Sequence, residues 1–321
     1  MRVRRIKVLK KDAIYHCMTR CVNGEFLIGS DLCKEILRKG IWKAADFSGL
    51  EVLTYCVMSN HFHVLVKVPF VERVSDKELL RRYKVLYPKP TRYQMATIEV
   101  MEANLKQGGE EAEAIRQKLL ARMHDVSAFM KLVKQRYSVW YNKTYERYGT
   151  LWADRFKSVL VQDSGNTLPI MSAYIDLNPV RAQVVEDAKD YRFCAYGEAV
   201  AGNERAVSGL RRVMGSGSEK FLSDYRVLMH AKDSRKEPEV YEKYLAELRR
   251  GGRLSVAEVL RVRVRYFTDG CVLGSQAYVE EQFREFRDCF GKKRRTGARR
   301  MRGSVWGGLH VMRDLRREVF G

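Results

Sequence analysis

Two histidines one residue apart are the first side chains in this sequence that could do chemistry. His61 and His63 lie in the stretch SNHFHVLVKV, at residues 59–68. Alternate side chains of a strand point to the same face, so both imidazoles project to one side while Phe62 and Val64 project to the other. Two neutral imidazoles at this spacing can bind a metal ion. A pattern this short also occurs in ordinary structural strands, so a third ligand is needed.

The helix predicted at residues 166–185 offers a third ligand and a nucleophile. Tyr174 and Asn178 are four residues apart and therefore share one helical face. The side-chain carbonyl of Asn178 is a hard ligand that suits Mg²⁺ or Mn²⁺ better than zinc, and the hydroxyl of Tyr174 can act as a nucleophile. Taken alone, this helix is better explained by a core tyrosine and an asparagine that caps the helix before Pro179, because the chain holds 17 tyrosines.

The elements that must position these residues follow an α+β pattern. Strands separated by helices, with hairpin-compatible pairs, predict an antiparallel sheet with helices packed on one face. Charged helical segments at about residues 70–130 are interpreted as an insertion. The expected strands cover residues 13–22, 50–59, 62–68 and 150–162, and the expected helices cover residues 31–49, 126–149 and 166–185.

The chain of 321 residues is long enough for one main domain and an appendage. We expect the main domain at residues 1–198. Residues 199–250, with their glycines, serines and charges, are expected to form a linker or helical region. Residues 251–321 are expected to form a basic helical module, in which two helices joined by a glycine-containing turn resemble a helix-turn-helix pair.

The charge balance indicates a polyanionic partner. The sequence holds 60 Lys and Arg against 39 Asp and Glu, a formal net charge of +21. Nucleic acid is the leading partner class, and an anionic membrane surface comes second because no clear basic amphipathic helix is found. Residues 292–303 form a basic run without an acid, which predicts phosphate contacts that read no sequence, or else a solvated run. The candidate contacts in this run are Lys292, Lys293, Arg294, Arg295, Arg299 and Arg300.

The location of the protein is predicted from what the sequence lacks. No apolar stretch approaches the roughly 20 residues that span a bilayer, and the basic N-terminal segment has no apolar core of a signal peptide. We therefore expect a cytoplasmic protein without a membrane partner. The seven cysteines include no C-x-x-C pair, which favours reduced thiols over a zinc ribbon or a disulfide framework.

Basic and aromatic side chains interleave beside the chemical motifs. Arg155, Lys157 and Arg181 flank them and are predicted to contact a nucleic-acid backbone. Trp152 precedes these positions and Phe156 lies between the first two of them, and such aromatic rings could stack on bases. Core packing is the alternative for these two rings, and we favour it for at least one of them.

Three stretches in order carry a family resemblance: MSNHFHVLVKVP, GTLWADRFKSVLV and YIDLNPVRAQVV. They resemble the HUH single-tyrosine transposases, in particular the REP-associated tyrosine transposases. Residues 61–63 match the His-hydrophobic-His motif, and residues 174–179 match the helix that carries the nucleophile. The resemblance covers about residues 12–198 without the insertion, and it implies a ferredoxin-like HUH nuclease fold. Some relatives have glutamine as the third ligand, where this chain has Asn178.

The resemblance implies cleavage and rejoining of single-stranded DNA from a mobile element. Tyr174 would attack a phosphate and form a 5′-phosphotyrosine link, with Mg²⁺ or Mn²⁺ held by His61, His63 and Asn178. The implied partner is single-stranded DNA with hairpin-containing repeats, and a homodimer is left open. Two alternatives remain at this point: a catalytically silent DNA-binding regulator of the same fold, and a metal-dependent phosphodiesterase that uses water.

Overall fold

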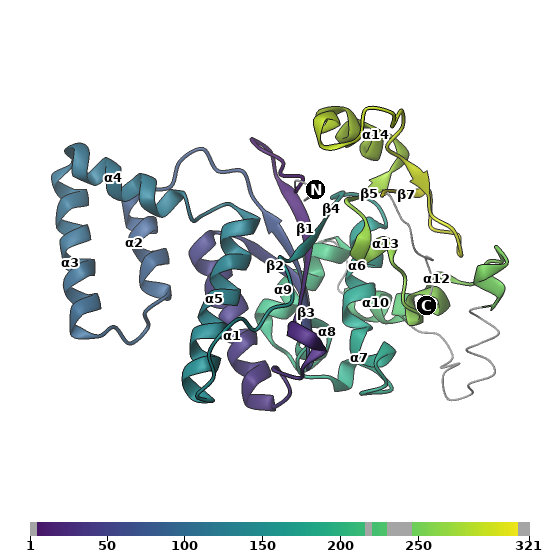
Figure 1. Ribbon diagram of the computed structural model, residues 1–321, viewed down its shortest axis with the longest axis horizontal. Helices are drawn as coiled ribbons and strands as arrows, with labels where there is room; N and C mark the ends of the chain where they lie inside the picture. The colour runs from purple at the N-terminus through teal and green to yellow at the C-terminus, as the bar shows by residue number, and fades with distance from the viewer. Residues whose placement is uncertain (1–4, 216–219, 230–245, 314–321) are drawn as a thin grey trace.

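A four-stranded antiparallel sheet forms the centre of the fold (Figure 1). The computed structural model describes residues 5–215, 220–229 and 246–313. The strands follow the order β2-β3-β1-β4, with one helix between β1 and β2 and a second long helix before β4, which is a ferredoxin-like arrangement. The α+β prediction is thus confirmed. The elements are β1 (Ala13–Arg20), α1 (Asp31–Ser48), β2 (Glu51–Val57), β3 (His61–Val68), α5 (Val126–Thr144) and β4 (Lys157–Val161).

Strand β3 lies inside the sheet, between β2 and β1. Its residues 62–66 are all buried, as expected for an apolar, β-branched run that is covered on both faces. Met18 of β1 is opposite His63, and His16 is opposite Leu65. Because side chains alternate along each strand, His16 and His63 project from the same face of the sheet as diagonal neighbours.

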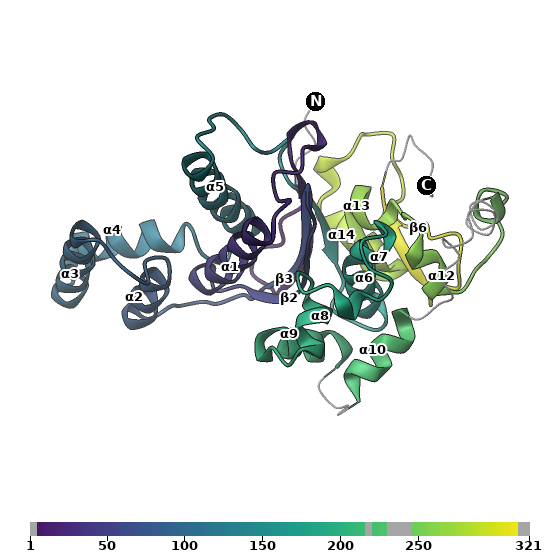
Figure 2. The ribbon, with the colours of Figure 1, turned by 90° about the horizontal axis from the view of Figure 1, so that it is seen from below.

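Helices cover both faces of the sheet (Figure 2), not one face as predicted. Helices α1 and α5 pack on one side, and four shorter helices pack on the other. Gly209 explains how closely this second layer approaches: a Cβ atom there would lie 2.6 Å from the carbonyl oxygen of Leu53 on β2. The second layer consists of α6 (Thr167–Asp176), α8 (Ala195–Val200), α9 (Glu204–Met214) and α10 (Phe221–Met229).

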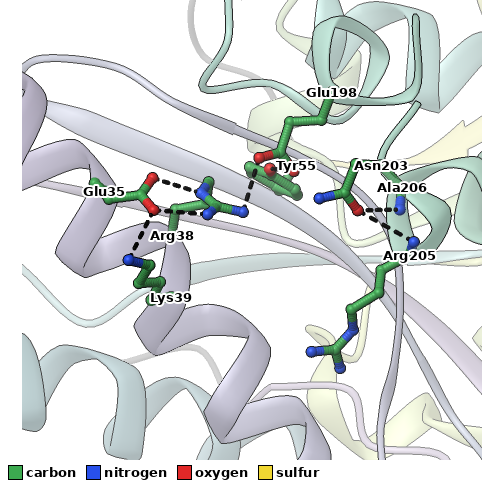
Figure 3. Close-up of polar contacts among 8 residues, drawn as sticks. All are labelled: Glu35, Arg38, Lys39, Tyr55, Glu198, Asn203, Arg205 and Ala206. Carbon is green, nitrogen blue, oxygen red and sulfur yellow. Dashed lines mark hydrogen bonds and ion pairs between the residues drawn. The ribbon is translucent and has the colours of Figure 1, made fainter. Parts of the chain in front are cut away.

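A polar network joins the two helical layers across β2, the edge strand of the sheet (Figure 3). Arg38 of α1 binds Glu35 and Glu198, each at 2.7 Å, and Tyr55 of β2 donates a hydrogen bond to Glu198 of α8. A covered edge strand is protected from pairing with another chain. Residues 199–250, which were expected to form a linker or helical region, contribute α9 and α10 to the same helical layer.

Residues between β3 and α5 form a helical arm that projects away from the sheet (Figure 1). Leu80 and Leu105 form a small apolar cluster within the arm, and Leu79 and Leu119 pack in a second cluster with Phe47 of α1, which ties the arm to the main domain. This is the segment that was predicted as a helical insertion. Its helices are α2 (Asp76–Val85), α3 (Arg92–Gln107) and α4 (Gly109–Leu120).

The C-terminal segment extends the sheet and differs from the expected helical module. Strand β5 pairs parallel with β4, and the described sheet then has seven strands in the order β2-β3-β1-β4-β5-β7-β6. Because β5 separates the two helical stretches, they do not form a helix-turn-helix pair. The elements are α12 (Val256–Arg261), α13 (Tyr266–Asp269), β5 (Val272–Ser275), α14 (Gln276–Glu285), β6 (Arg299–Arg300) and β7 (Leu309–Met312).

In the part of the chain that the structure describes, none of the helices has the length and apolar character needed to cross a membrane.

Candidate functional site

His61 and His63 lie on the sheet face that α6 covers. Their ring centroids are 5.2 Å apart and their planes are nearly perpendicular, at 81°. His63 is buried, whereas His61, at the start of β3, is partly exposed. The Met58 amide donates to the His61 carbonyl at 2.9 Å and closes the tight turn that leads into β3. The turn therefore places one imidazole at the rim of the site and the other inside it.

Tyr174 and Asn178 approach the histidines from the helical layer. Helix α6 ends at Asp176, and the short helix α7 (Asn178–Arg181) follows, with a proline in its first turn, where no amide donor is required. The Tyr174 ring centroid lies 6.3 Å from that of His63. The Asn178 amide donates to the Ile175 carbonyl at 2.9 Å, and its side chain also lies within hydrogen-bonding reach of His61. The structure thus brings these four predicted residues together.

A third histidine belongs to the same cluster. Nε2 of His16, on β1, lies 2.8 Å from Nδ1 of His63, and Nδ1 of His16 lies 2.8 Å from the carbonyl oxygen of Phe267. The ring centroids of His16 and Tyr174 are 6.4 Å apart. Sequence reasoning gave His16 no role in the site, because the alignment of β1 beside β3 cannot be read from either strand alone.

The Tyr174 ring lies between an aromatic ring and a cation. Phe267 stacks against it with a centroid distance of 4.6 Å, and the Arg181 guanidinium lies 4.1 Å from its centroid. Arg181 also donates to the carbonyl oxygens of Tyr174 at 2.6 Å and Leu260 at 2.9 Å. Tyr174 is consequently only 2% exposed. Arg181, predicted as a backbone contact, lies inside the site itself.

The three histidines are held in the neutral form. Burial lowers the pKa of His16 to about 4, and it lowers the pKa of His61 to about 4 with a smaller contribution from Arg20. Burial and the neighbouring His16 hold the pKa of His63 well below its usual range. Neutral imidazoles keep a lone pair that a metal ion can use, and the arginines give the site a positive potential that suits a phosphate.

The remaining predicted contacts lie on different parts of the molecule. Arg155 is exposed before β4, and Lys157 on β4 forms an ion pair with Asp269 at 2.7 Å. Trp152 and Phe156 are 8% and 9% exposed, so both rings pack in the core, which was the favoured alternative for at least one of them. Stacking on bases by these two rings has no support in this arrangement.

The basic run of residues 292–303 lies on the C-terminal extension. Arg294 is partly buried, with its guanidinium 5.1 Å from the ring centroid of Phe290. Arg299 and Arg300 form β6, which is the far edge strand and five strand positions from β3, or roughly 24 Å along the sheet. The run is thus separate from the histidine site. Its exposed members are Lys292, Lys293, Arg295, Arg299 and Arg300.

The donor atoms of the cluster fit a hard divalent ion with open coordination positions. Among residues 5–215, 220–229 and 246–313, no three His, Cys, Asp or Glu side chains are placed to hold a metal. Two imidazoles and the Asn178 amide oxygen are the donors present. Asn60 donates its amide to the Gly24 carbonyl at 3.1 Å, so its oxygen faces Nδ1 of His61 at 2.7 Å. Nδ1 must then carry the hydrogen, which leaves the Nε2 lone pair of His61 available.

Comparisons with known proteins give two similarities. Residues 10–99 match the family model described as "Transposase IS200 like". A solved structure of a REP-associated tyrosine transposase bound to a REP hairpin is similar at 15% identity, with a TM-score of 0.39, over 63% of this chain and 87% of that chain. A search of curated proteins finds no match. The matched residues include His61 and His63, and over this stretch the chain is similar to the IS200-like transposases, which supports the resemblance drawn from the motifs.

Proposed function

We propose that this chain is a DNA transposase that cleaves and rejoins single-stranded DNA through a covalent link to Tyr174. The observation that carries the proposal is the packing of the Tyr174 ring 6.3 Å from that of His63, with Asn178 one turn further on beside His61. The neutral histidines and the neighbouring arginines support it. A nucleophile, metal-binding donors and a positive field are the three parts that phosphodiester transfer requires.

Tyr174 supplies the nucleophile in the proposed step. Its hydroxyl oxygen attacks the scissile phosphorus and gives up its proton, the bond from phosphorus to the 3′ oxygen breaks, and that oxygen leaves as a free hydroxyl. The new bond is a 5′-phosphotyrosine. A later attack by a 3′-hydroxyl on this phosphorus rejoins the DNA and restores Tyr174. His61, His63 and Asn178 would hold Mg²⁺ or Mn²⁺, which when bound polarises the phosphate oxygens.

The phosphate reaches Tyr174 from the side of Arg181. Phe267 is fully buried and closes one face of the Tyr174 ring, whereas Arg181 over the other face is only partly buried. A guanidinium that binds carbonyl oxygens can exchange them for phosphate oxygens, with which it forms stronger charge-assisted hydrogen bonds. Arg181 therefore moves toward the incoming phosphate in this proposal and exposes the tyrosine hydroxyl.

The proposed substrate is single-stranded DNA with hairpin-containing repeats. The net charge of +21 supports a polyanionic partner, and the family of the matched region supports DNA. Exposed Arg155 and the basic run of residues 292–303 would add phosphate contacts outside the site.

The decisive experiment compares two Tyr→Phe substitutions. Wild-type protein is mixed with single-stranded DNA and Mn²⁺, and a denaturant-resistant adduct is expected only when the label lies on the 3′ side of the cut. Tyr174→Phe should abolish both cleavage and adduct. Tyr137→Phe is the matched control, because Tyr137 is also buried but donates to the Leu27 carbonyl at 2.7 Å from α5, on the opposite face. This control should keep both activities.

Three results would contradict the proposal in different ways. An adduct that persists in Tyr174→Phe would mean that another residue is the nucleophile. Cleavage by the wild type without any adduct would indicate water as the nucleophile. Binding of DNA without cleavage, under every metal tested, would favour the regulator.

A further inference from the structure

A chain of hydrogen bonds connects the C-terminal extension to the proposed metal site. It runs from the carbonyl oxygen of Phe267 to Nδ1 of His16, and from Nε2 of His16 to Nδ1 of His63, with 2.8 Å at each step. The rings of His16 and His63 are nearly parallel, with an interplanar angle of 12°. His16, His63 and Phe267 are all at most 2% exposed, so water does not compete for these bonds.

The hydrogen positions in this chain follow from the chemistry of its first member. A backbone carbonyl can only accept, so Nδ1 of His16 must donate and carries the hydrogen. Neither hydrogen-bond partner of His16 is a carboxylate, and a buried imidazolium without one is strongly disfavoured. His16 is therefore neutral, and its Nε2 can only accept. Nδ1 of His63 must then donate, which leaves Nε2 of His63 without a hydrogen.

We propose that His16 is a positioning residue, which fixes His63 in the tautomer with a bare Nε2 and so prepares it to bind the metal ion. The carbonyl of Phe267 thereby fixes which atom donates and which accepts in both hydrogen bonds. This inference rests on the proposed function, because it assigns a use to the Nε2 lone pair. The arrangement extends a general rule: a metal-binding histidine donates its second ring N–H to an acceptor that holds the ring and its tautomer. Here a second histidine is that acceptor.

The alternative tautomer shows why the direction matters. If His16 carried its hydrogen on Nε2, it would donate to Nδ1 of His63, and Nδ1 of His16 would face the Phe267 oxygen with a lone pair. Two acceptors would then meet at 2.8 Å, and His63 would hold its hydrogen on Nε2, the atom needed for the metal. The extension thus acts on the tautomers of His16 and His63 through the carbonyl group of Phe267.

The first test reads the tautomer directly in the metal-free protein. The full-length chain is labelled with ¹⁵N-histidine, and long-range ¹H–¹⁵N correlation spectra at neutral pH distinguish the protonated ring nitrogen from the bare one. His16→Gln and His63→Ala assign the signals. We expect His16 and His63 both to carry hydrogen on Nδ1. Hydrogen on Nε2 of His63 would overturn the proposal, whatever the enzyme's activity.

The second test measures Mn²⁺ binding by calorimetry in two variants of His16. Glutamine can accept through its side-chain oxygen and donate through its amide, so His16→Gln should bind Mn²⁺ about as tightly as wild type. Leucine fills the space but can do neither, so His16→Leu should weaken binding by roughly 10- to 100-fold. A purely structural role predicts equal affinities for both variants, and that result would overturn the proposal.

The two tests also separate this inference from the proposed function. If wild-type protein shows no Mn²⁺ binding that depends on His63, the proposed metal function fails while the spectra still decide the tautomer. If His16→Leu does not fold, the spectra of the wild type and the Mn²⁺ affinity of His16→Gln decide. A hydrogen on Nδ1 of His63, together with wild-type Mn²⁺ affinity in His16→Gln, supports the inference. A loss of Mn²⁺ affinity in His16→Gln contradicts it.

Discussion

Asp176, two residues after Tyr174, should make the stability of the protein fall as pH rises. Its carboxyl is completely buried and accepts from the Thr54 hydroxyl at 2.9 and 3.0 Å and from the Tyr225 hydroxyl at 2.6 Å. These bonds tie α6, which carries Tyr174, to β2 and to α10. The perturbation is Asp176→Asn, which keeps an oxygen acceptor in the same place but cannot ionise.

The magnitude follows from the pKa of this carboxyl. Burial raises the pKa of Asp176 from 3.8 to about 7, although its hydrogen bonds act in the other direction. The folded state therefore holds the proton more tightly than the unfolded chain. Unfolding is favoured progressively as pH rises from about 4 to about 7, and the effect is constant above that range. From pH 5 to pH 8, the free energy of unfolding should fall by about 2–3 kcal/mol from this group.

Urea unfolding followed by tryptophan fluorescence, at pH 5, 6, 7 and 8, measures this effect. The comparison between wild type and Asp176→Asn cancels the titration of other groups. The wild type should lose about 2–3 kcal/mol relative to the variant over this range. Parallel stability curves for the two proteins would refute the reasoning, because they would mean that Asp176 ionises equally in both states. A wild type that gains stability relative to the variant would show a lowered pKa instead.

Three further outcomes are expected at the site and on the extension. His61→Ala and His63→Ala should each abolish metal-dependent cleavage in a gel assay but leave DNA binding within a few-fold, and equal cleavage by the double variant would contradict the metal assignment. Arg181→Gln should lower the single-turnover cleavage rate by at least roughly 100-fold without weakening Mn²⁺ binding, because it removes a cation at the phosphate; an unchanged rate would exclude that role. Lys292, Lys293 and Arg295 are exposed members of the basic run, and replacing all three by serine should weaken DNA binding. The slope of the logarithm of the DNA-binding constant against log salt should fall by about 0.7 for each lost contact with single-stranded DNA. An unchanged slope would mean that the run of residues 292–303 is solvated and does not contact DNA.

Substitution is preferable to truncation on the extension. Val311 and Met312 of β7 are completely buried, and β7 pairs with β5. Removing the end of the chain would therefore strip core residues as well as charge, and weakened DNA binding could not be attributed to lost phosphate contacts.

Patterns that act within one element were readable from the sequence. Alternation along β3 placed His61 and His63 on the same face, and helical spacing placed Tyr174 and Asn178 side by side. The α+β succession of strands and helices also followed from local periodicity. These predictions needed no knowledge of which strand lies next to which, whereas the ferredoxin-like fold was expected only from the family resemblance.

Features that depend on distant pairing were missed. The role of His16 depends on the alignment of β1 with β3, and the role of Phe267 depends on where the extension packs. Strand β5 has only four residues between two helices, which is too short for a recognisable period. Helix α9 did offer a signal, since Ala206, Leu210 and Val213 have helical spacing and are buried, but the surrounding glycines and charges suggested a linker.

The distance along the chain between His16 and Phe267 has a consequence for the order in which the site is completed during synthesis. The two residues that share this hydrogen bond are 251 positions apart. A nascent chain that has exposed only β1 to β4 and α6 already has its histidines and Tyr174, but one face of the tyrosine ring is bare and His16 has no carbonyl to bind. Translation adds roughly 5–20 residues per second, so this state lasts for seconds. We therefore expect the proposed site to mature only after the segment that carries Phe267 has emerged from the ribosome and packed against α6.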